Sequence, residues 1–320
     1  MAMTSDQAVG MLRAAAEPTR LRILALLARE ELAVLELCRV LGQSQPRVSR
    51  HLKLLAEAGL VERFPDGAWV FYRLSAAAPA KALVDQILGL ISGDDATVTR
   101  DAERLAGVGD ERGAQAAAYF ADNAERWDEM RSLHTAEAAV EAAILDAAGQ
   151  GPFDRLVDLG SGTGRMLTLL GPRARGAVGL DLSRQMLNIA RAQTAAAGLT
   201  ACELRHGDIL GTGLPDGCAD LVIVHQVLHY LDDPGTAVAE AARVMARGGQ
   251  MLIADFAPHG LEFLRDDDAH RRLGFSDREV EGWFAGAGLR LAASDTIAPP
   301  PGGDKLTVKV WLARAGREKK

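Results

Sequence analysis

The chain has 320 residues and carries 36 lysines and arginines against 43 aspartates and glutamates, a formal net charge of −7. This length is sufficient for two domains with cores of their own, and no apolar run reaches the about 18 residues of a membrane helix, so we expect a cytoplasmic protein with no membrane partner. The cysteines, Cys38, Cys202 and Cys218, are far apart, which excludes a disulfide framework.

Residues 32–74 follow the pattern helix, turn, helix and hairpin. The first helix keeps its apolar residues on one face and is broken by Gly42, and Ser44 can cap the second helix, residues 45–55. That helix has an apolar face with spacings of four and three, made by Val48, Leu52 and Leu55. Residues 60–64 and 69–74 flank an Asp-Gly pair, which is a strong hairpin signal. The segment predicts an α+β winged helix-turn-helix whose second helix enters the major groove of DNA.

Basic and polar residues occupy the other face of the second helix and the hairpin. Residues 1–92 hold 11 Lys and Arg against 9 Asp and Glu, so this segment is net positive while the rest of the chain is acidic. Positive charge on the reading face is what neutralisation of DNA phosphates requires. The residues that we expect to contact double-stranded operator DNA are Ser44, Gln45, Arg47, Ser49, Arg50, Lys53, Arg63 and Gly67.

The next segments read as helices. Residues 76–91 have an apolar face suited to a partner helix, and residues 96–150 are rich in alanine and glutamate with a helical period. In this region the aromatic residues Tyr119, Phe120 and Trp127 either cover a cofactor or pack between helices. We predict a DNA-binding and dimerisation domain over residues 1–92, a helical linker or lid over 93–150, and a second domain over 151–320.

Strands and helices alternate in the second domain. The expected strands are residues 155–159, 177–181, 202–206, 219–225, 249–255, 289–297 and 305–313. Such alternation is typical of an α/β fold with a doubly wound parallel sheet. No helix is expected between the last two strands, so we expect them to pair antiparallel.

Glycines and acidic residues follow these strands in a particular order. Residues 156–164 predict a buried strand that enters a tight glycine turn, where the backbone can approach a ligand because no Cβ intervenes. Asp181 ends the next apolar run, at about the 20-residue distance where nucleotide-binding units have their ribose ligand, and Asp208 follows the third strand. The glycine turn, Asp181 and Asp208, in this order along the chain, predict a site for a nucleoside-type cofactor.

With these motifs in place, the chain resembles two families at once. Residues 1–92 resemble the ArsR/SmtB winged-helix repressors through residues 16–24, residues 44–52 and the hairpin. Residues 115–320 resemble class I methyltransferases that use S-adenosyl-L-methionine (SAM), of the ubiquinone/menaquinone and arsenite methyltransferase type, through residues 158–164, 207–208 and 225–231. The resemblance implies a regulator that binds operator DNA as a homodimer, followed by a Rossmann-like class I methyltransferase domain with an antiparallel last strand.

The resemblance also implies roles for individual residues. In the methyltransferases the glycine loop holds the methionine end of SAM, the acid after the second strand binds the ribose, and the acid after the third binds the adenine amine. The cofactor residues expected here are Asp158, Gly160, Ser161, Gly162, Thr163, Gly164, Asp181, Leu182, Met186, Asp208, Ile209 and His225. His229 is the expected catalytic base, with His225, Tyr230, His259 and residues 263–275 on the side of the substrate.

The sequence departs from both families at positions where metals bind. Ala33 and Leu35 stand where many repressors have a pair of metal-binding thiolates, and residues 81–91 contain no histidine. Arsenite methylation needs clustered thiolates, and Cys202 and Cys218 are better explained as structural residues. We therefore expect no metal site, and we assign the pair His225 and His229 to the pocket lining.

Three functions are compatible with these features. The protein is a DNA-binding repressor with a methyltransferase domain that methylates a small molecule. Alternatively, the second domain senses SAM or its product S-adenosylhomocysteine and controls methionine or methyl-cycle genes without catalysis. In a third reading, the winged helix only dimerises or targets an ordinary methyltransferase.

Overall fold

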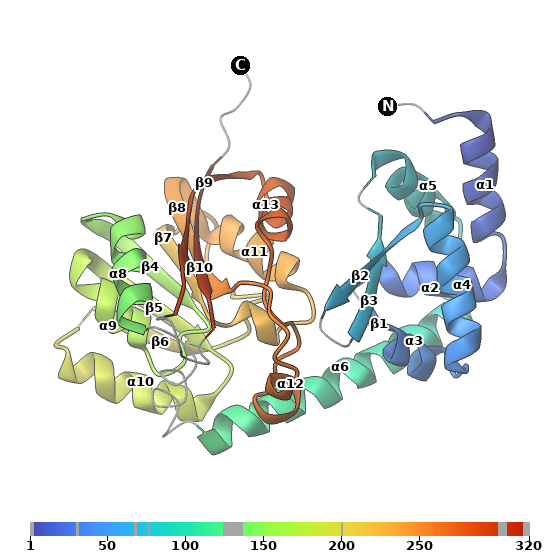
Figure 1. Ribbon diagram of the computed structural model, residues 1–320. Coiled ribbons are helices and arrows are strands. Elements are labelled where there is room, and N and C mark those ends of the chain that lie inside the picture. Colours follow the sequence, from blue (N-terminus) through green and yellow to red (C-terminus); the bar gives the residue numbers. More distant parts are fainter. Residues whose placement is uncertain are drawn as a thin grey trace. The chain divides into compact units, whose positions relative to one another are not determined.

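The computed structural model describes residues 3–29, 32–66, 69–75, 77–123, 137–199, 201–299 and 306–315, which pack as two units (Figure 1). The units are Met1–Ala114 and Gln115–Lys320, and each has its own buried apolar core. Within the described residues, no helix combines the length and the apolarity that crossing a membrane requires. The three-part division at residues 92 and 150 stays a prediction.

The first unit is the predicted winged helix-turn-helix. Its helices are α1 (Ser5–Ala15), α2 (Pro18–Leu27), α3 (Val34–Leu41), α4 (Gln45–Glu57), α5 (Ala78–Gly89) and the start of α6 (Ala96–Asn123). Its strands are β1 (Leu32–Ala33), β2 (Val61–Asp66) and β3 (Trp69–Leu74). They form an antiparallel sheet in the order β1-β3-β2, in which β2 and β3 are the predicted hairpin.

The turn between α3 and α4 follows from the local sequence. Gly42 ends α3 with φ of +65°, a left-handed conformation that glycine adopts without steric cost. Val48, Leu52 and Leu55 are fully buried, as the spacing predicts. The capping role expected of Ser44 is wrong in one respect. Ser44 occupies the N-cap position, but its side chain makes no capping hydrogen bond; the residue is exposed, so water is available to the first turn of α4.

The second unit is a doubly wound sheet flanked by helices. Its strands are β4 (Phe153–Leu159), β5 (Ala174–Asp181), β6 (Cys202–His206), β7 (Ala219–His225), β8 (Met245–Phe256), β9 (Leu289–Ile297) and β10 (Val308–Ala315). Their order is β6-β5-β4-β7-β8-β10-β9. Strands β4 to β8 pair parallel, and β10 pairs antiparallel with both β8 and β9, which confirms the predicted antiparallel end of the sheet.

Helices cover both faces of this sheet. They are α8 (Glu137–Ala148), α9 (Arg165–Leu170), α10 (Arg184–Ala196), α11 (Pro234–Val244), α12 (Phe263–Asp267) and α13 (Asp277–Gly286), with short helices η2 (Gly171–Arg173) and η3 (Leu228–Tyr230). One apolar core joins α8 and α9 to the sheet, and the other joins α11 and α13 to it. Because β4 lies between β5 and β7, the strand order reverses there, and ligands of such folds bind beyond the carboxyl ends of the strands at that reversal.

Candidate functional site

Helix α4 presents a polar, positively charged face. Gln45, Arg47, Arg50 and Lys53 are exposed, and Ser49 is half-buried. Ser44, which precedes α4, and Arg63, which is in β2 of the hairpin, are also exposed. Gly67 lies outside the described residues. Lys53 makes only a long ion pair with Glu57, at 3.8 Å between exposed side chains. Such a surface pair is weak, so the Lys53 charge stays available to another partner.

Helix α6 holds the turn that precedes α4, a feature that sequence reasoning missed. Arg104 donates from Nη1 to the carbonyl of Val40 at 3.1 Å, and this carbonyl belongs to the last turn of α3. Asp101 accepts two hydrogen bonds from the Arg22 guanidinium, at 2.5 and 2.7 Å, and its side chain is 4% exposed. Helix ends leave carbonyls without helical partners, so the Arg104 contact stabilises the end of α3. We call Arg22, Asp101 and Arg104 the α6 clamp.

The glycine loop after β4 brings the loop backbone and Asp181 together. Gly160 and Ser161 donate their N–H groups to the Leu180 carbonyl, both at 2.8 Å, and Gly162 donates to Asp181 Oδ2 at 2.8 Å. Gly160, Gly162 and Gly164 have φ values of +76°, +50° and +86°. A Cβ on Gly160 would lie 2.7 Å from Val227 Cγ2, so this position also requires glycine for lack of space.

Asp181 is half-buried, and both of its carboxylate oxygens accept hydrogen bonds from the backbone. Its Oδ1 accepts the Ser183 N–H at 2.8 Å, and its Oδ2 accepts the Gly162 N–H. Burial raises the pKa of Asp181, and the two backbone hydrogen bonds and nearby His206 only partly oppose this effect. A carboxylate that is short of water gains from further donors such as the hydroxyls of a ribose.

The other predicted cofactor residues lie around this loop or follow the neighbouring strands. Asp158, Thr163, Met186 and Ile209 are buried, Leu182 is 60% exposed, and His225 is half-buried at the end of β7. The Ser161 Oγ is buried and has no hydrogen-bond partner among the described residues. A buried hydroxyl without a partner among the described residues, in a loop with glycine at residues 160, 162 and 164, fits a ligand that brings polar groups against the backbone. The residues therefore fit the methionine end of a nucleoside cofactor.

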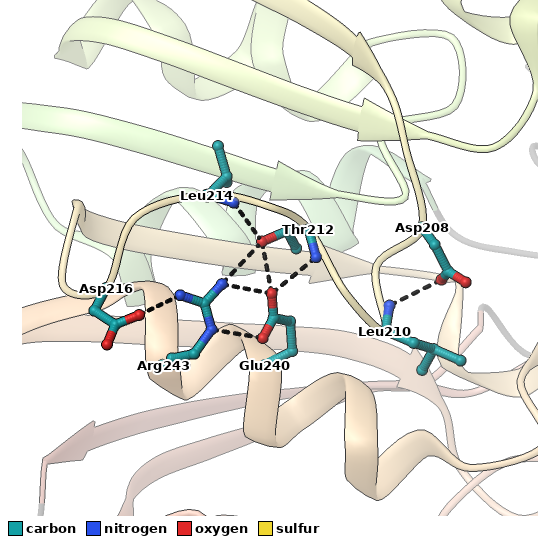
Figure 2. Close-up of polar contacts among 7 residues, drawn as sticks. All are labelled: Asp208, Leu210, Thr212, Leu214, Asp216, Glu240 and Arg243. Carbon is teal, nitrogen blue, oxygen red and sulfur yellow. Dashed lines mark hydrogen bonds and ion pairs between the residues drawn. The ribbon is translucent and has the colours of Figure 1, made fainter.

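The loop that follows Asp208 is fixed to α11 by a polar network, which Figure 2 shows. Glu240 accepts from the backbone and hydroxyl of Thr212 at 2.8 and 2.7 Å and from Arg243 at 2.7 Å. Arg243 also pairs with Asp216, and Thr212 Oγ1 accepts the Leu214 N–H at 3.1 Å. The hydrogen bonds from Arg243 lower the pKa of Glu240 to about 2.

Asp208, the acid expected at the adenine, is exposed at the start of this loop. It accepts the Leu210 N–H at 2.9 Å, so the position expected at the adenine belongs to an ordered loop.

Beyond β7 the chain forms a second set of polar contacts. Gln226 has φ of +50°, which is uncommon for a residue with a Cβ, and its N–H bonds to the Ala254 carbonyl at 2.7 Å. His229, expected as the base, is 1% exposed, and its Nδ1 lies 2.6 Å from Oδ1 of Asp255, which sequence reasoning missed. The side chains of Tyr119 and Phe120, and all of Trp127, lie outside the described part of the chain.

Comparisons with known proteins agree with these two halves. Residues 17–63 match the family described as bacterial regulatory protein, arsR family, and residues 157–253 match the family described as methyltransferase domain. The arsenic resistance transcriptional regulator ArsR1 of Pseudomonas putida is 43% identical over 97 residues, 30% of this chain and 74% of the relative. The demethylmenaquinone methyltransferase of Thermus thermophilus is 34% identical over 143 residues, 43% of this chain and 64% of the relative.

A solved structure supports the fold of the second unit. A chain from the complex between the Haloferax volcanii Trm112 methyltransferase activator and a methyltransferase aligns with a TM-score of 0.51 at 25% identity, over 62% of this chain and 97% of that chain. The present chain spans 64% of the length of that demethylmenaquinone methyltransferase and 37% of the length of another curated relative that it matches.

The fold and the two sites define a winged-helix regulator joined to a class I methyltransferase domain. The chain belongs to the ArsR family of bacterial regulatory proteins, with the methyltransferase domain fused behind its winged helix.

Proposed function

We propose that the protein is a transcriptional repressor that binds operator DNA as a homodimer. The exposed basic face of α4 supports DNA contact. One recognition helix reads few base edges, and a two-fold dimer places two such helices about 34 Å apart. Val9 and Leu12 of α1 are 44% and 48% exposed, and this apolar surface supports the expected dimer contact through α1, with Ala16, and through α5.

The DNA proposal is tested with the upstream DNA of the protein's own gene. Replacing both Arg50 and Lys53 by alanine removes two exposed cations from α4, so binding weakens and its dependence on salt becomes shallower by about two phosphate contacts. The matched control is Arg29→Ala with Arg100→Ala, which removes two exposed cations outside α4 and outside the helices of the expected dimer contact. Equal affinity and salt dependence of the α4 variant and the wild type would assign the DNA contact to another surface.

We further propose that the second unit binds SAM and transfers its methyl group to a small molecule. The observation that carries this proposal is the glycine loop bonded to Asp181, in which the buried Ser161 hydroxyl has no hydrogen-bond partner among the described residues. When bound, SAM supplies a methyl group already activated on sulfur, so the protein has only to orient the acceptor, exclude water and move a proton. The similarity to a demethylmenaquinone methyltransferase favours a small acceptor over a macromolecule.

Individual residues then take distinct roles. Asp181 accepts the ribose hydroxyls, Asp208 accepts the adenine amine, and the loop of residues 160–164 holds the methionine end. His229 takes the proton of the acceptor. Calorimetry tests the first of these roles. We expect micromolar binding of S-adenosylhomocysteine, about −8 kcal/mol, and a loss of about 2–3 kcal/mol in Asp181→Ala, which leaves ribose hydroxyls without an acceptor. Absence of binding by the wild type would end the proposal.

A second function, sensing of SAM or S-adenosylhomocysteine, is favoured by the α6 clamp. Helix α6 contacts the turn before α4 through Arg104 and continues to Asn123, beyond the first unit. If the cofactor changes operator affinity, the operator changes cofactor affinity by the same factor. Cofactor affinity measured with and without saturating operator DNA separates the two functions, because equal values contradict sensing and leave the methyltransferase proposal intact.

A further inference from the structure

A buried acid–imidazole pair lies at the carboxyl ends of β7 and β8. His229 belongs to η3 and Asp255 to β8, and their side chains are 1% and 0% exposed. The Asp255 carboxylate accepts three hydrogen bonds, from His229 Nδ1 at 2.6 Å, Leu228 N at 3.0 Å and Phe256 N at 2.8 Å. A carboxylate only accepts, so Nδ1 carries a proton and the lone pair of the ring is on Nε2.

The imidazole ring is held in place from several directions. Its centroid lies 4.1 Å from that of Tyr230, 4.7 Å from that of Phe256 and 4.3 Å from that of His270. The carbonyl of His229 accepts the N–H groups of Arg271 at 2.9 Å and of Arg272 at 3.0 Å. The hydrogen bond between Nδ1 and Asp255 is the one that the ring makes within the described residues. The ring therefore has a fixed orientation and one nitrogen available to a ligand.

The pair is connected to the cofactor loop through the chain that follows β7. Val227, two residues before His229, lies so close to Gly160 that a Cβ there would be 2.7 Å from Val227 Cγ2. Gln226 precedes it in a left-handed conformation and bonds to Ala254, the neighbour of Asp255. Backbone in a sparsely populated conformation is commonly retained where function requires it. The segment 226–229 thus links the glycine loop to the buried pair.

We infer that Asp255 is the positioning residue that aims His229 Nε2 at the methyl acceptor, and that the acceptor is protic, carrying an O–H, N–H or acidic C–H group. This inference rests on the proposed methyltransferase function. The acceptor passes its proton to Nε2 while its nucleophilic atom bonds to the methyl carbon, and the electron pair of the broken carbon–sulfur bond stays on sulfur. The imidazolium that results lies against the Asp255 carboxylate, which stabilises its charge.

The inference is tested without knowledge of the acceptor. The chain has seven histidines, whose ring nitrogens can be labelled with ¹⁵N and observed by NMR in the full-length protein, with the His229 signals assigned from His229→Gln. The positive sulfonium of SAM disfavours a second charge nearby, whereas S-adenosylhomocysteine has a neutral sulfur. If Nε2 faces the transferred methyl, the ¹⁵N chemical shift of His229 Nε2 differs between the complexes with SAM and with S-adenosylhomocysteine, and by more than that of Nδ1, which faces Asp255. The ring signals of His51 in the first unit should be the same in both complexes.

Other titratable groups around the ring are included in the design. Tyr230 and His270 contact His229, and the nearby Arg272 is paired with Glu279 at 2.8 Å. His270→Gln identifies the NMR signals of the second imidazole, so that they are not mistaken for those of His229. Asp255→Asn should bring part of the His229 ring into the form protonated on Nε2, which the ¹⁵N shifts report and which a purely structural Asp255 would not cause.

The outcomes are distinguishable. Lack of SAM binding in calorimetry contradicts the methyltransferase proposal itself. SAM binding with the same ¹⁵N shift of His229 Nε2 in both complexes overturns the inference and leaves that proposal standing. A lone pair on Nδ1 in the wild type would also overturn it, because the ring would then not donate to Asp255. If Asp255→Asn fails to fold, the wild-type comparison still decides.

Discussion

The contact between Gly160 and Val227 gives a prediction that can be worked out from the structure. In Gly160→Ala the new Cβ would lie 2.7 Å from Val227 Cγ2, 3.0 Å from its Cβ and 3.1 Å from its Cγ1. The backbone φ of +76° adds a left-handed cost of about 1–2 kcal/mol for alanine. Overpacking against a branched side chain costs about 1–3 kcal/mol. We therefore expect Gly160→Ala to destabilise the second unit by about 2–5 kcal/mol and to weaken S-adenosylhomocysteine binding.

A double-mutant cycle separates the two costs. Val227→Ala removes the clashing methyl groups, so in that background Gly160→Ala should cost about 1–3 kcal/mol less. Gly198→Ala is the matched control, since Gly198 has φ of +71° and nothing within 4 Å of a new Cβ. Hydrogen exchange of the β4 and β5 amides reports the second unit alone. Identical costs for Gly160→Ala in the two backgrounds, or no greater cost than that of Gly198→Ala, would refute the packing argument.

Three further predictions concern charged groups. Since the pKa of Asp181 is raised, S-adenosylhomocysteine affinity should fall on acidification from neutral pH before an ordinary aspartate titrates, and calorimetry of Asp181→Asn should lack this dependence. The lowered pKa of Glu240 means that its contribution to stability is present above about pH 4.5 and is lost as pH falls towards about 2; acid unfolding of Glu240→Gln should lose this component. Asp101→Ala leaves Arg22 without its partner and should destabilise the first unit by about 1–3 kcal/mol in urea, whereas Glu111→Ala, which breaks the exposed pair with Arg39, should cost less than about 1 kcal/mol.

The elements that could be predicted from the sequence are those whose residue pattern lies within one short segment of the chain. The parallel strands appear as apolar runs, the glycine loop as a dense motif, and α4 as apolar residues at helical spacing. The left-handed Gln226 carries no sequence signal, because glycine or asparagine is the usual residue for that conformation.

Polar pairs that join distant segments were not predictable. Asp101 meets Arg22 across 79 residues and Asp255 meets His229 across 26, and neither pair has a spacing that a helix or strand imposes. Glu240 and Arg243 are three residues apart on α11, but their bonds to Thr212 and Asp216 depend on the fold of the intervening loop.

Helix α6 bears on how such a chain arises and diversifies. Leu105 and Val108, which are 4% and 7% exposed, belong to the core of the first unit, and Asp101 completes its buried ion pair. The division between the two units, after Ala114, therefore lies inside a continuous helix rather than in a loop. Recombination that exchanged the second module while sparing the regulator would have to keep the reading frame and helical phase past Val108. A lineage with a different partner domain should retain this half of α6 as part of its winged helix.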